Sequence, residues 1–156
     1  MRGLQLFLYA ECGAGTPSKD DFLMSAASAA GGPPLAARPF VSALAKRLLG
    51  RPRGASALLA HVDRVWAYSI SWKGAGPQIQ TFVNALGAVL SGKPIGLAHK
   101  HFSARYAELA ANLSSKLAAG ESESSSPDHE LLQLRFATMD ARNYVIIGDP
   151  AARIPL

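Results

Sequence analysis

Residues 4–21 read LQLFLYAECGAGTPSKDD, and this stretch decides the fold. It begins as an apolar run without polar alternation, which is typical of a strand buried on both faces, as in a parallel sheet. The run then breaks at Gly13, Gly15 and Pro17, which together indicate a turn. The only cysteine of the chain, Cys12, therefore lies just past the carboxyl end of the predicted strand. Open α/β sheets bind their ligands at this edge.

Two interpretations of Cys12 are open. A lone cysteine is most often a small buried hydrophobic residue. However, Cys12 follows the apolar run instead of lying inside it, and Gly13 directly after it lets a ligand approach the backbone closely. The loop continues with Lys19, Asp20 and Asp21, whose charges need water or partners. Cys12 is therefore the best candidate for chemistry in the chain.

Length and composition predict one domain, residues 1–156, with a hydrophobic content of 49% that argues against disorder. No apolar run approaches the roughly 20 residues that cross a bilayer, so we expect no membrane partner. A single cysteine excludes an intramolecular disulfide and fits a reducing compartment, so we expect a cytoplasmic protein. The four histidines lack metal-ligand spacing, so no metal site is predicted.

The net charge of +5 raises nucleic-acid binding as a hypothesis. The basic residues are scattered along the chain, apart from one group made up of Lys46, Arg47, Arg51 and Arg53. This group follows a predicted helix, where the helix dipole favours positive charge in a solvated position. Nucleic-acid binding is therefore a disfavoured hypothesis.

The apolar pattern predicts an α/β fold in which strands and helices alternate. It favours helices over residues 39–50, 77–91 and 95–119, and strands over 55–62 and 144–147. Residues 130–140 are ambiguous between strand and helix, and 121–128 read as a polar, mobile loop. A strand, a covering helix and another strand predict a right-handed crossover with parallel strands.

The second strand should therefore end at the same sheet edge as Cys12. Its exit carries His61, Asp63 and Trp66, a dense group of charged and aromatic residues for a strand end. The exit could be solvated, with Trp66 packed on the core, or it could form the wall of a substrate pocket. His61 could be a buried structural residue or a catalytic base.

Five pieces of the chain occur in an order that resembles the CHAT branch of the caspase-like (clan CD) cysteine peptidases. They are AECGAGTPSKDDF, FVSALAKRLL, GASALLAHVDRVW, FVNALGAVLSGKPIGLA and YVIIGDPAARI, and together they span most of the chain. The resemblance implies a caspase-like three-layer αβα sandwich with a mostly parallel sheet. It also implies a cysteine endopeptidase that cleaves a protein or peptide substrate without a cofactor.

The resemblance further implies roles for individual residues. Cys12 would be the nucleophile that attacks the peptide carbonyl as a thiolate. Its backbone N–H, with that of a glycine from another segment, would hold the oxyanion, and Gly13 is its neighbour in that loop. Asp63 would recognise a basic side chain of the substrate and Trp66 would line the pocket. The family pattern has no base at the position of His61, which is an alternative base only because it should lie at the same sheet edge.

The family's catalytic histidine precedes the nucleophile, whereas only eleven residues precede Cys12 here and none is a histidine. The resemblance therefore implies the C-terminal half of a domain, with the N-terminal strands missing and an upstream domain or second chain completing the sheet. An inactive relative that serves as a non-catalytic interaction module is the alternative. In either case the first strand would have an unpaired edge, which invites association.

Overall fold

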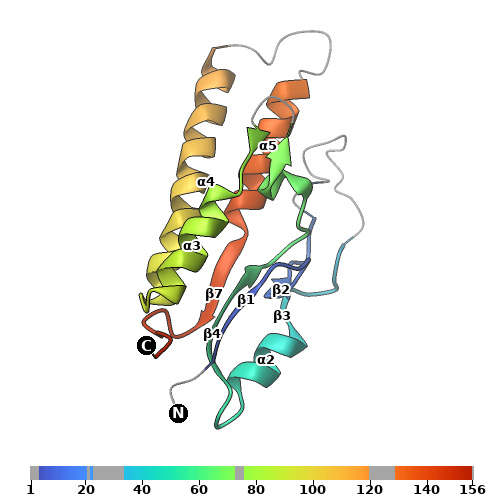
Figure 1. Ribbon diagram of the computed structural model, residues 1–156. Helices are drawn as coiled ribbons and strands as arrows, with labels where there is room; N and C mark the ends of the chain where they lie inside the picture. Colours follow the sequence, from blue (N-terminus) through green and yellow to red (C-terminus); the bar gives the residue numbers. More distant parts are fainter. Residues whose placement is uncertain (1–3, 21, 23–33, 73–75, 120–128, 156) are drawn as a thin grey trace.

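The structure, a computed structural model, describes residues 4–20, 22, 34–72, 76–119 and 129–155. These residues form a mixed α/β fold with a small central sheet and four helices (Figure 1). The loop predicted over residues 121–128 lies outside the described residues.

The central sheet has three strands in the order β1-β4-β7. They are β1 (Leu4–Leu8), β4 (Ala55–His61) and β7 (Tyr144–Gly148). β1 and β4 run parallel, as predicted, but β7 runs antiparallel to β4. The sheet is therefore mixed instead of mostly parallel. Tyr144, the first residue of β7, pairs with the last residue of β4, so β7 starts at the carboxyl edge and runs back along β4.

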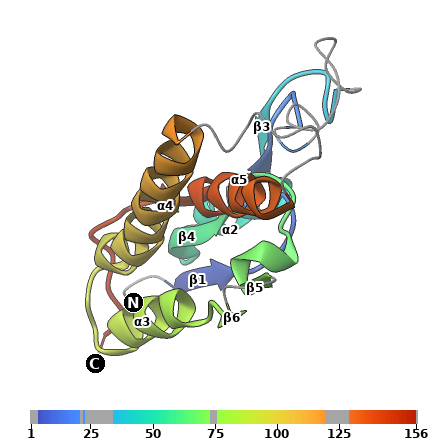
Figure 2. The same cartoon turned by 90° about the horizontal axis from the view of Figure 1, so that it is seen from above.

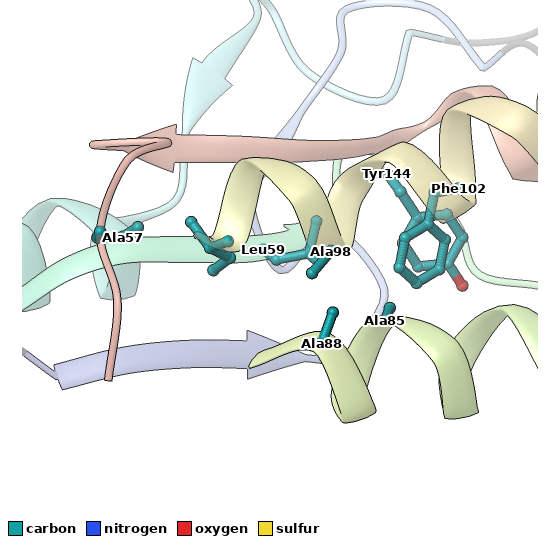
Figure 3. Packing of buried hydrophobic residues seen from close by; sticks show 9 residues of the cluster. Ala57, Leu59, Ala85, Ala88, Ala98, Phe102 and Tyr144 are labelled. Atoms are coloured by element: carbon teal, nitrogen blue, oxygen red, sulfur yellow. The ribbon is translucent and has the colours of Figure 1, made fainter. Parts of the chain in front are cut away.

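Helices pack on both faces of this sheet. On one face, α3 (Gln80–Leu90) and α4 (Ile95–Ala118) contribute alanines and Phe102 to a core with Leu59 and Tyr144 (Figure 3). α3 lies along β1 (Figure 2). On the other face, α2 (Ala43–Leu49) packs Ala45 against the centre of β4. This second face carries much less helix than the first.

The ambiguous segment is helical and forms α5 (His129–Arg142). Its apolar residues Leu134, Ala137 and Ala141 are spaced by three or four positions and pack together with Leu109 of α4. This periodicity of about 3.6 residues distinguishes a helix from a strand, whose period is two. α5 ends directly before β7, so it delivers the chain to the carboxyl edge of the sheet.

Two predicted helices begin later than expected. The first starts at Ala43 instead of Pro39, because Ser42 caps it by accepting the Ala45 N–H at 3.1 Å. Phe40–Val41 instead forms β3, antiparallel to β2 (Gly15–Thr16). The other, α3, starts at Gln80.

Five short elements complete the fold of the described residues. Besides β2 and β3, they are the 3-10 helix η1 (Ala67–Ser69) and the two strands of a ribbon, β5 (Ser71–Trp72) and β6 (Gly76–Pro77). Pro77 therefore belongs to a strand and not to the helix predicted over 77–91. The predicted bounds of β4, α4 and β7 are correct to within one residue.

Helix α3 carries a stripe of apolar residues that faces outward in part. Phe82, together with buried alanines, packs on the core, whereas other members of the stripe lie on the surface. These exposed residues are Ile79, Val83, Leu86 and Leu90. The helix sequence QTFVNALGAVL contains no charged residue. Such a face is unusual for a solvated helix, whose outer side is normally polar.

The terminal Gly148-Asp149-Pro150 segment forms a turn, and the chain from Pro150 to Ala152 caps α4. The carbonyls of Pro150 and Ala152 accept the N–H groups of Gly96 and Ile95 at 2.9 and 3.0 Å. The first N–H groups of a helix have no partner within it, so these bonds hold the start of α4 to the end of β7.

Candidate functional site

Cys12 lies beyond the end of β1, at the carboxyl edge of the sheet. Its backbone N–H donates to the carbonyl of Asp63 at 2.9 Å, and the Ala14 N–H donates to the carbonyl of His61 at 2.9 Å. The loop after β1 therefore continues alongside the exit of β4. The structure brings Cys12 and the Asp63 turn together, as the sequence led us to expect. The Cys12 side chain is partly buried and does not belong to the core.

The backbone of Cys12 is left-handed. Its φ of 51° makes it the only non-glycine residue with positive φ in the described part of the chain. A residue with a Cβ atom is less stable in this conformation by about 1–2 kcal/mol. Such strained residues concentrate at functional sites, where the surrounding structure holds them in place.

Gly13 makes the turn after Cys12 tight. It is buried, and a Cβ atom built on it would lie 3.0 Å from Leu8 Cδ2 and 3.1 Å from the Ala10 carbonyl oxygen. Its N–H donates to that Ala10 carbonyl at 3.2 Å. Because the Cys12 N–H is also engaged, an oxyanion could use these two donors only after the loop rearranges.

Ser42 joins the Cys12 loop to helix α2, a role that the sequence analysis missed. Its hydroxyl donates to the Gly13 carbonyl at 2.8 Å and accepts the Ala45 N–H, and its own N–H donates to the Ala14 carbonyl at 2.9 Å. One side chain thus caps the helix and holds the loop. A serine before an apolar helical run is the signal that could have revealed the cap.

His61 is fully buried, and both of its ring nitrogens are engaged. Nδ1 lies 2.9 Å from the Asp63 carbonyl oxygen, and Nε2 lies 3.1 Å from the Asp140 carbonyl oxygen. The Asp63 N–H also donates to Nδ1 at 3.2 Å, so a ring with its proton on Nε2 accepts at Nδ1 and donates to the Asp140 carbonyl. These contacts favour the structural interpretation of His61 over a role as base for Cys12.

Asp63 is also buried, with 1% of its surface exposed. Its Oδ1 accepts the Arg64 N–H at 2.7 Å, and the Arg64 guanidinium pairs with Asp20 at 2.9 Å. This ion pair ties the loop after Cys12 to the turn after β4. In this arrangement the Asp63 carboxylate does not face a substrate.

Trp66, the predicted pocket wall, is 40% exposed. Its ring stacks on Phe136 of α5 at 6.4 Å between centroids and lies 5.5 Å from the ring of Phe22. The indole therefore packs on one side while part of it faces solvent. Trp66 and Asp63 lie on one turn, but only Trp66 is accessible.

A buried polar cluster centred on Asp140 lies behind this turn. The Asp140 carboxylate accepts the Ser69 hydroxyl through Oδ2 and the Trp66 N–H through Oδ1, the latter at 3.2 Å. Arg105 of α4 lies 3.9 Å from Oδ2, and His61 Nε2 lies 3.7 Å from Oδ1. Asp140, Ser69 and His61 are each 0% exposed. We call Asp140, Ser69, His61, Arg105 and Tyr144 the Asp140 cluster.

Burial is the main cause of the pKa shifts in this cluster. It raises the pKa of Asp140 despite the Ser69 hydrogen bond and the nearby His61, which oppose the rise. Burial also lowers the pKa of Arg105, an effect that the Asp140 carboxylate opposes. The pKa of Tyr144, whose hydroxyl lies 2.8 Å from the Ser69 hydroxyl, is raised by burial and by the nearby Asp140. Each shift has the sign that desolvation of the charged form produces.

The cluster connects the helices to the candidate nucleophile. Asp140 contacts His61, His61 contacts the Asp63 carbonyl, and that carbonyl holds the Cys12 N–H. The sequence analysis missed Asp140 and Arg105. The signal that could have revealed Arg105 is its position in the apolar stripe of α4, three residues after the buried Phe102.

Comparison with known proteins identifies no relative: no family model, curated protein or solved structure matches the chain. Within the described ranges, no group of three His, Cys, Asp or Glu side chains is placed to hold a metal ion. None of the helices in those ranges combines the length and the apolar character that a membrane span requires. The function must therefore be argued from the site alone.

Strain at Cys12 predicts an inverted glycine effect. We expect the Cys12→Gly variant to be more stable than Cys12→Ala by about 1 kcal/mol, because glycine adopts positive φ freely. Ala107→Gly, on the exposed side of α4, is the control and should destabilise by about 1 kcal/mol. Urea denaturation followed by circular dichroism measures both. Equal stability of the two Cys12 variants would contradict the strain.

The raised pKa of Asp140 predicts a pH dependence of stability. The folded state binds this proton more tightly than the unfolded chain, so the free energy of unfolding falls as pH rises above the ordinary value of 3.8. Asp140→Asn keeps an acceptor oxygen but cannot titrate. We therefore expect the stability of the wild type, relative to this variant, to decrease from about pH 4 to the raised pKa.

Urea titrations at several pH values measure this difference. Glu130→Gln, which alters an exposed ion pair with Lys116, is the control and should change stability by less than about 1 kcal/mol. If the wild type and Asp140→Asn lost stability in parallel as the pH rose, the pKa of Asp140 would not be raised.

Proposed function

We propose that the chain is the C-terminal half of a caspase-like cysteine peptidase domain, with Cys12 as its nucleophile. The observation that carries the proposal is the strained, left-handed backbone of Cys12 at the carboxyl edge of the sheet. Nucleophiles of other hydrolases occupy similarly strained turns after a strand, which present the reactive atom to the substrate. In a caspase-like sandwich, α2 would belong to the second helical layer.

The chemistry assigned to Cys12 is acyl transfer. The thiolate attacks the carbonyl carbon of a peptide bond, the amine leaves with a proton, and water hydrolyses the thioester. Both ring nitrogens of His61 already have partners. The catalytic base would therefore come from a segment that adds to the sheet beside β1. Recognition of a basic side chain by Asp63 stays a prediction that requires the turn to open.

The open edge of β1 supports an incomplete sheet. Among the described residues β1 pairs only with β4. The side-chain amide of Gln5 in β1 is buried beside α3 and has no hydrogen-bond partner among the described residues, which costs about 1–3 kcal/mol. Next to this edge lies the uncharged outer stripe of α3. We call the open edge and the stripe, which comprises Ile79, Val83, Leu86 and Leu90, the β1–α3 surface.

An added strand would complete the backbone hydrogen bonds of β1, and an added helix or loop would cover the stripe. Both features favour a partner that carries the rest of the domain. The same surface also favours the second candidate function, a non-catalytic interaction module, because docking on it does not require Cys12. Reactivity of the thiol separates the two.

The peptidase proposal predicts a reactive thiol in the folded chain. We expect iodoacetamide to alkylate Cys12 in the native protein as well as in the protein unfolded by urea, because the thiol is only partly buried and lies at the edge of the sheet. Mass spectrometry over time measures the modification, and Cys12→Ser is the unlabelled control. Labelling that occurs only after unfolding would leave the interaction module as the better candidate.

The β1–α3 surface predicts self-association of the isolated chain. We expect the mass from light scattering to rise with concentration, and the double variant Val83→Lys with Leu90→Lys to remain monomeric. Both side chains are exposed, at 53% and 70%, so the variant should fold. Leu117→Lys, an exposed leucine on α4, is the matched control and should associate like the wild type. A wild type that stays monomeric on concentration would argue against this surface.

A further inference from the structure

An apolar cleft lies beside the Cys12 loop and has no assigned role. Its volume is about 470 Å³, within the range of small-molecule sites, which is about 300–1,000 Å³. It lies between the segment after Cys12, strand β3 and the ends of β4 and β7. Its larger lining side chains are Thr16, Phe40, Val41, Val62, Val145 and Ile147.

The cleft exists because little helix covers this face of the sheet. α2 is seven residues long and packs Ala45 on the middle of β4, and no other described helix contributes to the hydrophobic cluster on this face. Gly15 forms the opposite wall. A Cβ atom on it would lie 2.5 Å from the Phe40 carbonyl oxygen, so only glycine lets β2 pack this closely on β3.

The lining selects an uncharged, apolar occupant. None of the described lining residues carries a charge, and a charged side chain bound among them would lose its hydration without a compensating partner. A large apolar side chain would instead gain about 25 cal/mol for each square ångström removed from water. It would also cover Phe40 and Val41, which are 51% and 44% exposed.

The backbone around the cleft favours an extended ligand. β2 and β3 are two-residue strands that pair only with each other among the described residues. A peptide can align with such a short open ribbon by backbone hydrogen bonds and place one side chain in the adjacent pocket. This geometry distinguishes a peptide from a compact small molecule.

The cleft lies near the candidate nucleophile, although Cys12 is not one of the lining residues given above. Ala14 lines the cleft and is two residues from Cys12. Its N–H donates to the His61 carbonyl, and Val62, which follows His61, also lines the cleft. A side chain held there would place its peptide backbone along the Cys12 loop.

We propose that this cleft binds a large aliphatic or aromatic side chain of an extended peptide. The proposal rests on the proposed peptidase function for its role in substrate choice, and it adds an apolar preference to the basic one predicted from Asp63.

The test is a binding measurement that needs no turnover. Blocked tetrapeptides of alanine with leucine, phenylalanine, lysine or aspartate at the third position are titrated into the full chain. Methyl signals of Val62, Val145 and Ile147 are followed by NMR. We expect the leucine and phenylalanine peptides to shift these signals. The charged peptides should bind more weakly by a factor of at least about ten.

Val41→Glu places a charge at the mouth of the cleft and should weaken binding of the leucine peptide about tenfold. Leu44→Glu, at a leucine that is 48% exposed on α2 and does not line the cleft, is the matched control and should bind like the wild type. Should Val41→Glu fail to fold, Val145→Phe, which fills the cleft from the sheet side, takes its place.

Three results would overturn the proposal: unshifted cleft methyls, equal binding of the lysine peptide, or full binding by a folded cleft variant. These outcomes are independent of the peptidase assignment. An unreactive Cys12 with intact apolar binding would remove the peptidase and keep the cleft, whereas a reactive Cys12 without peptide binding would remove only the cleft.

Discussion

The hydrogen bond from the Cys12 N–H to the Asp63 carbonyl is the contact on which the candidate site depends. It exists because β1 and β4 run parallel and side by side, so that their carboxyl ends meet. The bond holds the loop in a left-handed conformation that the Cys12 backbone would otherwise avoid. The same carbonyl faces His61 Nδ1, so a single oxygen atom joins the loop to the buried part of the molecule.

The Asp140 cluster holds the Asp63 carbonyl in place from the buried side of the turn after β4. Buried charges lose hydration, so a cluster of this kind is weak evidence for stability as such. Its value here is geometric, because Asp140 contacts the Trp66 N–H, Ser69 and His61 and thereby fixes both ends of the turn after β4. The packing of α5 on α4 is in this way connected to the conformation of a loop at the surface.

The molecule presents two apolar surfaces of different shape. The β1–α3 surface is an open strand edge beside an uncharged helix face, which suits a partner that adds secondary structure. The cleft beside the Cys12 loop is concave and suits a single side chain. They lie on opposite faces of the sheet, so one partner could complete the fold while the cleft stays open to a peptide.

The sequence by itself determined the features that depend on neighbouring residues: the first strand and the turn after it, the central strand and the long helix α4. Only the tertiary structure decided the antiparallel direction of β7, the exposure of the α3 stripe and the burial of Arg105 and Asp140. The reason is physical. Periodicity shows that a face is apolar but not what covers it, and a buried charge is stable only beside partners that come from distant parts of the chain.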